Sequence, residues 1–523
     1  MLKKLKQLLI THKILLIALF IFCSGTFVLL DNGKHFSFNL EPYPDGFFYI
    51  VPAWNFIKNG DFSMTYDQTT ISSFVPPFYS LFLIPIYFLF SAPIAFYFLN
   101  FLLGILSIFF VYLFLKENFS TKVLTLVLLY AFLPITLWLP SLPMAENLVL
   151  FLIVSILWLW KTTYINKKVK IFLLALLQNI LFFTKYSSFT FLIPFNILLC
   201  FEFFRKKEFK KLSLYIALCI SFLLFFLWNT QSQYIKNVFS PQIETKGGGE
   251  EIIAFSLNYV PSNFKQFLNI ISGSPHFFLW EKISLFPLGF FLTILFVVFL
   301  PKLREKVMKK IMFWELFLIF LGILILQSFF YVLDMRYLIG LLPTFIFLVG
   351  LIFQEIFKKS QNVFIGVAIF MAIIFFTNFS FYKKLIATNW LQRSRAWQYE
   401  ATQHLLSEEQ LNDSMIITAL PPFLFELYGS PNFKVMPLAF SQEFMNEDQR
   451  IWERNIDYEN LQDYYNHLLN EEKSLFITNA YITQTKSVID EFENYKNNFN
   501  LELISEGCNQ ACNIYKLTLS KNP

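Results

Sequence analysis

A short set of ionisable side chains lies within or beside long apolar segments, where a charge needs a specific reason. At the centre of a bilayer such a group costs on the order of 2.5–3.5 kcal/mol. The set comprises Glu41, Asp45, Asp61, Asp67, Glu146, Lys185, Asp334 and Arg336. A carboxylate can deprotonate a hydroxyl, while arginine and lysine can hold a phosphate leaving group. The chemistry that these residue types favour is transfer of a group from a phosphate carrier to a hydroxyl.

Several of these residues also have a purely structural explanation. A lysine or arginine at the end of a membrane helix can extend to the lipid headgroups, which would account for Lys185 and Arg336. Asp334 would then neutralise Arg336. Glu146 would cap a helix expected to begin at Asn147, because the helix dipole favours an acid there. For these residues the sequence leaves both explanations open.

The aspartates of the first polar stretch differ in their context. Asp61 and Asp67 are best explained as solvated loop residues. Asp45 is harder to assign to structure alone, because it lies between Pro44 and Gly46 just before an aromatic-rich amphipathic stretch. Asp45 is therefore the candidate base.

The composition predicts that lipid is the solvent of most of the chain. Hydrophobic residues make up 56% of the 523 positions and charged residues only 15%, against a usual ~25% charged in soluble domains. The 70 Phe and 10 Trp agree with this, because aromatic side chains fit bilayer interfaces. We predict a polytopic α-helical membrane protein with about 11–13 membrane-spanning helices.

Charge divides the chain into two parts. From residue 385 onward, 19 Asp and Glu outnumber 10 Lys and Arg, whereas the whole chain has 42 basic and 36 acidic residues. The basic excess before residue 385 lies mainly in short loops, where it orients helices and contacts anionic lipid; nucleic-acid binding is a poor explanation. We predict a transmembrane catalytic domain over 1–384 and a small soluble α/β domain over 385–523.

The basic loops predict the topology. Five basic clusters should be cytoplasmic, as should the N-terminus, and they lie at 116–122, 161–170, 205–211, 302–310 and 358–359. The apolar segments between them include 123–140, 283–300 and 362–381 and, with an N-terminal anchor, make about eleven crossings. An odd number places the C-terminal domain outside the cytoplasm, together with two outer loops, 31–75 and 231–282. The second of these, which carries the run GGGEE, is expected to be a mobile loop.

One apolar stretch does not fit this alternation. Residues 76–91 are short, contain three prolines, and would reverse every later basic loop if they crossed the membrane fully. We therefore expect a partial or re-entrant element that lines a cavity, because such backbone is tolerated at membrane depth only where protein or water covers it.

The soluble tail alternates helical stretches, at 396–406 and 458–469, with short β runs, at 414–420 and 474–479. Near its end, Cys508 and Cys512 occur as CNQAC between two alternating runs typical of a hairpin, and a disulfide could close the turn. A disulfide would indicate an oxidising compartment. Two thiols without a nearby His make a poor metal site, so no cofactor is expected to be required, although a divalent metal stays open.

Four parts of the sequence, in order, resemble the GT-C membrane glycosyltransferases, the superfamily of protein O-mannosyltransferases and aminoarabinose transferases. The first outer loop carries an acid, an amphipathic stretch and a proline pair, in PDGFFYIVPAWNFIKNGDF and VPPFYS. A Glu-Asn pair follows in MAENLVLFLIVSILWL, a Thr-Lys pair in FFTKYSSFTFLIP and an Arg-Tyr pair in MRYLIGLLPTFIFLVG. Their order and spacing carry the resemblance, which covers about residues 10–380.

The resemblance implies an inverting glycosyltransferase of the cell membrane that uses a polyprenyl-phosphate-linked sugar. The acceptor would be a hydroxyl of a glycolipid, a glycan or a protein on the outer face. Asp45 would be the general base, and Arg336 and Lys185 would contact the donor phosphate. Further substrate contacts would come from Glu41, Glu146, Asn147 and Tyr337. Many relatives have adjacent Asp-Glu where this chain has Asp45 and Gly46, so the role of base is assigned to Asp45 alone.

Two other classes of function stay open. A transporter or flippase of lipid-linked sugars often shows two similar halves and ionisable residues at the membrane midplane. Neither feature is detected in the sequence, whose charges gather at one face. The second class is an assembly scaffold that keeps the fold without activity. The sequence indicates neither the sugar nor the acceptor.

Overall fold

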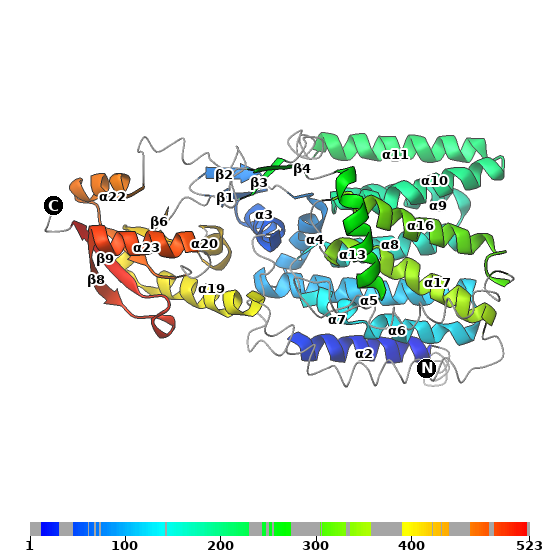
Figure 1. Ribbon diagram of the computed structural model, residues 1–523, viewed down its shortest axis with the longest axis horizontal. Helices are drawn as coiled ribbons and strands as arrows, with labels where there is room; N and C mark the ends of the chain where they lie inside the picture. The colour runs from blue at the N-terminus through cyan, green and yellow to red at the C-terminus, as the bar shows by residue number, and fades with distance from the viewer. Residues whose placement is uncertain are drawn as a thin grey trace.

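The computed structural model describes residues 12–30, 45–60, 62–66, 69–72, 75–90, 92–141, 144–229, 243–246, 250–253, 256–272, 304, 306–330, 335–356, 390–420, 422–429, 431–438, 461–480 and 486–519. Within them the molecule is elongated, with a bundle of long helices at one end and a mixed sheet with its own helices at the other (Figure 1). The predicted segments 283–300 and 362–381 lie outside the described residues.

The bundle is built from apolar helices close to the predicted segments. They are α2 (Lys13–Leu30), α5 (Ala92–Asn118), α8 (Glu146–Lys161), α9 (Lys167–Phe182), α10 (Phe189–Arg205), α11 (Phe209–Asn229), α16 (Ile311–Gln327) and α17 (Leu341–Ile356). In the described part of the chain, 3 helices are long and apolar enough to cross a membrane, judged by length and composition. The mostly helical fold is confirmed, whereas the number and direction of crossings stay predictions.

Two apolar segments are not single long helices. The predicted segment 123–140 consists of η1 (Thr121–Thr125), α6 (Leu126–Phe132), α7 (Pro134–Trp138) and η2 (Leu139–Ser141). Pro134 lacks an N–H group and so cannot continue α6, which ends two residues before it. The segment 76–91 forms α4 (Phe78–Tyr87), 10 residues long, or about 15 Å against a hydrocarbon core of about 30 Å. Its length fits a partial element, and its position in the membrane stays a prediction.

Close helix packing holds the bundle together. α5 packs against α8, α10 against α16, and α16 against α17. At the crossing of α10 and α16, a Cβ atom placed on Gly322 would lie 2.7 Å from Cβ of Pro194, so no larger residue fits there. Small residues at such positions let helix backbones approach, and dispersion contacts then stabilise the pair.

The two predicted outer loops contain regular structure. The first folds into α3 (Asp45–Asn59) and the hairpin of β1 (Ser63–Tyr66) and β2 (Thr69–Ser72). The second contains the hairpin of β3 (Ile243–Lys246) and β4 (Glu250–Ile253), then η4 (Leu257–Tyr259) and α13 (Val260–Ser272). The expectation of a mobile loop is wrong for α13, because the buried amide of Asn263 donates to the carbonyls of Ser328 and Phe330 at the end of α16.

The C-terminal sheet has the strand order β6-β5-β7-β9-β8. The strands are β5 (Met415–Thr418), β6 (Lys434–Pro437), β7 (Leu475–Thr478), β8 (Phe499–Ser505) and β9 (Ile514–Leu519). β5 pairs in parallel with β6 and β7, and β9 pairs antiparallel with β7 and β8. The helices are α19 (Trp390–Ser407), α20 (Pro422–Tyr428), α22 (Leu461–Asn470) and α23 (Lys486–Asn498). The tail thus contains a small α/β fold, with β6, α20 and α23 beyond those predicted.

Candidate functional site

Glu146 and Lys185 form an ion pair in the interior of the protein. Nζ of Lys185 lies 2.5 Å from Oε1 of Glu146, and the two side chains are 12% and 1% exposed. Glu146 is the first residue of α8, and Lys185 follows α9, just before η3 (Tyr186–Ser188). Ala145 holds the N-cap position, so Glu146 does not cap α8 as predicted; it is an acid in the first turn, where the helix dipole favours it. A buried carboxylate needs a partner of opposite charge, and Lys185 supplies it.

The short helix η5 (Met335–Leu338) brings Arg336 and Tyr337 to this pair. Nζ of Lys185 lies 4.8 Å from the centre of the Tyr337 ring, a cation–π contact. Nη1 of Arg336 lies 2.8 Å from Sδ of Met144, two residues before Glu146. Lys185 contacts Glu146 itself, and Arg336 contacts Met144 just before α8. Asp334, the expected partner of Arg336, lies outside the described residues.

Two polar atoms beside the pair lack a protein partner within the part of the chain that the structure describes. They are Oε2 of Glu146 and Nδ2 of the adjacent Asn147, both inaccessible to solvent. Buried polar groups are nearly always hydrogen-bonded in native proteins. The predicted substrate contacts Glu146 and Asn147 thus have one buried acceptor and one buried donor at the start of α8.

Helix α4 covers another side of this cluster. The backbone N–H of Phe78 donates to the carbonyl of Phe183, two residues before Lys185. The buried hydroxyl of Tyr79 donates to Oδ1 of Asn100 at 3.0 Å, and it is close enough to Glu146 to interact with its charge. Neither Tyr79 nor Asn100 was predicted as a site residue.

Helix α3, which begins at Asp45, packs on α4. The Ser80 hydroxyl donates to the carbonyl of Tyr49 at 2.7 Å, and the Tyr49 and Tyr79 ring centres are 5.5 Å apart. Asp45 precedes Tyr49 by four residues, or about one helical turn. Contacts therefore lead from the Glu146 and Lys185 pair through α4 to the helix that Asp45 begins. Glu41 lies outside the described residues.

The C-terminal domain contacts the opposite end of α3 through Glu426 of α20, and Figure 1 shows the two helices beside each other. The Trp54 indole N–H and the Lys58 ammonium both donate to the Glu426 carbonyl at 3.2 Å. The buried Asn55 amide donates to Oε2 of Glu426 at 2.9 Å and to the Ser63 carbonyl at 3.1 Å. Burial lowers the pKa of Lys58, and the Glu426 charge partly offsets that shift. The C-terminal domain is thus hydrogen-bonded to α3, the helix that begins at Asp45.

We expect Asn55→Leu to lower the free energy of unfolding by about 1–3 kcal/mol, because it removes the buried amide that donates to the Ser63 carbonyl and to the Glu426 carboxylate. The matched control is Asn59→Leu, the same substitution at an exposed position of α3. Thermal unfolding in detergent measures both. Equal midpoints for the two variants would contradict a structural role for this contact.

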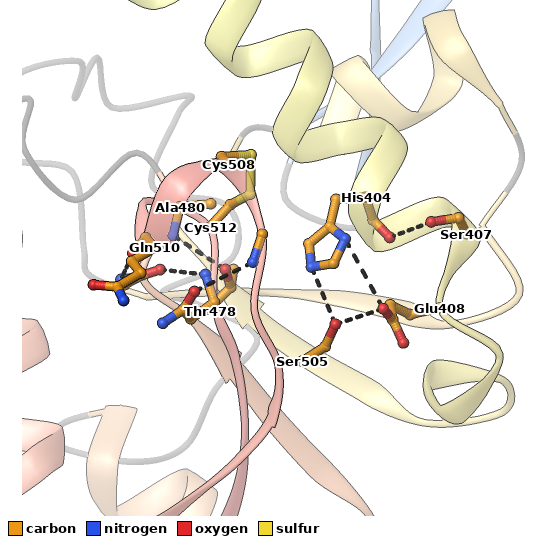
Figure 2. The surroundings of a disulfide bond; sticks show 12 residues. His404, Ser407, Glu408, Thr478, Ala480, Ser505, Cys508, Gln510 and Cys512 are labelled. Atoms are coloured by element: carbon orange, nitrogen blue, oxygen red, sulfur yellow. Dashed lines mark hydrogen bonds and ion pairs between the residues drawn. A yellow bond between two sulfur atoms is a disulfide. The ribbon is translucent and has the colours of Figure 1, made fainter.

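A second cluster of potentially reactive side chains lies in the C-terminal domain beside the disulfide that joins Cys508 and Cys512 (Figure 2). Ser505 Oγ donates to Oε1 of Glu408 at 2.6 Å and lies 3.4 Å from Nε2 of His404. His404 Nδ1 is 3.9 Å from the same Glu408 oxygen. In a catalytic triad the serine donates to the histidine, which the acid holds from its far side. Here the serine hydroxyl donates its hydrogen bond to the carboxylate instead, so the cluster joins the end of α19 to β8.

The structure offers no metal centre among its described residues, where no group of three or more His, Cys, Asp and Glu side chains could hold an ion. From the contacts described above, the candidate site consists of the Glu146 and Lys185 pair, Asn147, Arg336 and Tyr337, with Tyr79 beside them. Of these, all but Tyr79 were singled out from the sequence.

Comparison with solved structures shows the fold. The chain is similar to ArnT from Cupriavidus metallidurans in the apo state, with a TM-score of 0.61 and 10% identity over 90% of this chain and 93% of that chain. It is also similar to ArnT from the same organism bound to undecaprenyl phosphate, with a TM-score of 0.65 and 10% identity over 97% and 98% of the two chains. No protein-family model and no curated protein matches the sequence. The predicted resemblance to this group of membrane proteins is thus confirmed at the level of the fold.

Proposed function

We propose that this protein is an inverting glycosyltransferase that moves a monosaccharide from a polyprenyl-phosphate donor to an acceptor hydroxyl. The observation that carries the proposal is the group of Lys185 and Arg336 around buried Glu146, in a fold shared with an ArnT that binds undecaprenyl phosphate. A lipid phosphate is a leaving group that needs charge stabilisation more than protonation. Two fixed cations supply that stabilisation.

Lys185 and Arg336 both bind the donor phosphate, each with a different arrangement of N–H donors. The Lys185 ammonium has three N–H donors, of which one is directed to Glu146, so others can reach a phosphate oxygen. Arg336 presents paired donors that match two phosphate oxygens at once. Glu146 holds the ammonium in place. Asn147 and Tyr337 complete the substrate contacts from α8 and η5, and Glu41 adds one from the first outer loop.

Asp45 deprotonates the acceptor hydroxyl. It is the first residue of α3, the helix that packs on α4. An ionised carboxylate at neutral pH is what a general base requires. Attack from the face opposite the phosphate then inverts the anomeric carbon.

The reaction takes place on the outer face of the membrane, next to the C-terminal domain. The disulfide between Cys508 and Cys512 favours an oxidising compartment for that domain. The acceptor is a hydroxyl of a glycolipid, a glycan or a protein. A transporter of lipid-linked sugars is the less favoured function, because its ionisable residues would be expected at the membrane midplane between two repeats.

Binding of the carrier lipid tests this proposal. Purified protein titrated with a polyprenyl phosphate should form a one-to-one adduct in native mass spectrometry. Arg336→Met should weaken that adduct by about tenfold to a hundredfold, because a hydrogen bond to a charged group contributes about 1.5–3 kcal/mol. Equal affinity in the wild-type protein and the variant would contradict the phosphate role of Arg336, and no adduct in either would contradict the function.

A further inference from the structure

The end of the bundle remote from Glu146 contains a cavity of about 500 Å³. It lies where α8 and α10 end and α9 and α16 begin, and its lining includes Lys161, Lys170, Arg205 and Glu315. Helix α8 runs from Glu146 at the candidate site to Lys161 at the cavity, 16 residues in all. That is about 24 Å at 1.5 Å per residue, so the two sites cannot share one phosphate.

The cavity has a surplus of positive charge. Two carboxylates line the cavity, together with five cationic side chains: Lys161, Lys167, Lys170, Arg205 and Lys206. Both carboxylates already have partners: Glu315 is 2.6 Å from Lys161, and Glu202 is 2.5 Å from Lys206. Lys170 donates to the Thr162 carbonyl at 2.8 Å. Among the residues that the structure describes, Lys167, Lys170 and Arg205 form no salt bridge with a carboxylate. Glu202 attracts Lys170 at longer range, and the lining still has three more positive than negative side chains.

Topology alone does not account for this convergence. Basic loops orient a membrane protein wherever they lie on the correct side, and mutual repulsion should spread them apart. Instead the loop between α8 and α9 and the end of α10, which belong to two separate basic clusters of the sequence, line one cavity. An anion in that space would relieve the repulsion. Phosphate suits it, because arginine and lysine both bind phosphate oxygens.

The surroundings of the cavity are apolar and exposed, which identifies the source of the phosphate. On α16, Ile311 at the cavity is 54% exposed and Trp314 is 43% exposed. On the adjacent α10, Phe201 and Phe204 are 63% and 54% exposed. A soluble phosphate compound would make no contact with these exposed apolar side chains, whereas the acyl chains of a lipid would cover them.

We propose that this cavity binds the phosphate headgroup of an anionic glycerophospholipid, held by Arg205, Lys170 and Lys167 with its acyl chains along α10 and α16. A cavity of this volume is within the range of small-molecule sites. Basic pockets between membrane helices on the cytoplasmic side are known to hold such headgroups. This lipid would be distinct from the sugar donor and would bind at the other end of the bundle.

The test compares retained lipids by native mass spectrometry of purified protein titrated with phosphatidylglycerol or phosphatidylcholine. Wild-type protein should retain phosphatidylglycerol selectively, and Arg205→Gln with Lys170→Met should weaken it at least tenfold. The matched control is Lys210→Gln, an exposed lysine of the same basic cluster that does not line the cavity. The thermal unfolding midpoint and the binding of polyprenyl phosphate should be unchanged in all variants. If the double variant does not fold, the single variant Arg205→Gln, at an exposed position, replaces it.

Three outcomes would overturn the proposal. The first is equal retention of phosphatidylglycerol by the wild-type protein and the cavity variant, and the second is equal affinity for the two lipids. The third is displacement of phosphatidylglycerol by millimolar inorganic phosphate, which would make a soluble phosphate compound the ligand. Arg205→Lys keeps the charge that Arg205→Gln removes, and binding of phosphatidylglycerol by Arg205→Lys would support the proposal. Because no sugar donor takes part, failure here is distinguishable from failure of the proposed transferase activity.

Discussion

Replacing Asp45 by asparagine is expected to lower the turnover number of sugar transfer by about 10²- to 10⁴-fold, the usual contribution of a general base. Asparagine has nearly the same shape but takes up no proton from the acceptor. It is also well tolerated at the start of a helix, so α3 should form as before. Steady-state kinetics with a polyprenyl-phosphate sugar and an acceptor would measure the effect. We expect the loss in kcat, with the affinity for the donor nearly unchanged.

The matched control is Asp61→Asn, the same change in a residue that the sequence assigns to the solvated part of the same outer loop. It should leave turnover within about twofold of the wild-type value, far from the effect of removing a base. Undiminished turnover in Asp45→Asn would remove Asp45 from the mechanism. An equal loss in both variants would indicate a general effect of charge in the loop.

Replacing Lys185 by methionine is expected to lower the free energy of unfolding by about 3–5 kcal/mol, because it leaves the Glu146 carboxylate buried without its partner. The double variant with Glu146→Gln and Lys185→Met should recover most of this loss, since a neutral pair of similar volume carries no buried charge. Thermal or denaturant unfolding of the purified protein measures both effects. A single variant as stable as the wild-type protein would contradict the ion pair.

The same double variant separates the structural role of Lys185 from its role in binding. If Lys185 contacts the donor phosphate, the folded double variant should bind polyprenyl phosphate at least tenfold more weakly, in line with a charged hydrogen bond. The matched control is the ion pair of Lys310 with the buried Glu355, for which Lys310→Met with Glu355→Gln should leave donor binding unchanged. Full donor binding in the variant at Glu146 and Lys185 would make that pair purely structural.

Much of the fold could be predicted because its helices are long apolar runs between basic loops. The exceptions have physical reasons. Pro134 divides an apolar run whose hydropathy is continuous. The sequence predicts a loop where α13 forms, because the nearby glycine run favours a loop. Helix α23 did leave a signal, since Phe492 and Tyr495 are buried at helical spacing. Strand β6 has four residues and ends in a proline, which leaves little pattern to detect.

The candidate site could be predicted as single residues but not as an arrangement. Glu146, Lys185 and Arg336 stood out because each is a charge beside an apolar run. Their pairing depends on how α8 packs on α9, and Glu146 and Lys185 are 39 residues apart. Tyr79 gave no comparable signal, because a tyrosine in an aromatic-rich apolar segment resembles its neighbours. The contact of Glu426 with α3 joins positions 371 residues apart, beyond the reach of any local pattern.

The central claim is that the sugar leaves a polyprenyl phosphate on this protein, and the most direct measurement follows both products of that step. Purified protein in liposomes would be given a donor labelled in its sugar together with an envelope extract as the source of acceptors. The account predicts that the label moves to an acceptor with release of an equal amount of polyprenyl phosphate. In Asp45→Asn the rate of that release should fall by about 10²- to 10⁴-fold. Passage of intact donor across the bilayer, with no polyprenyl phosphate formed, would contradict the account and identify a transporter.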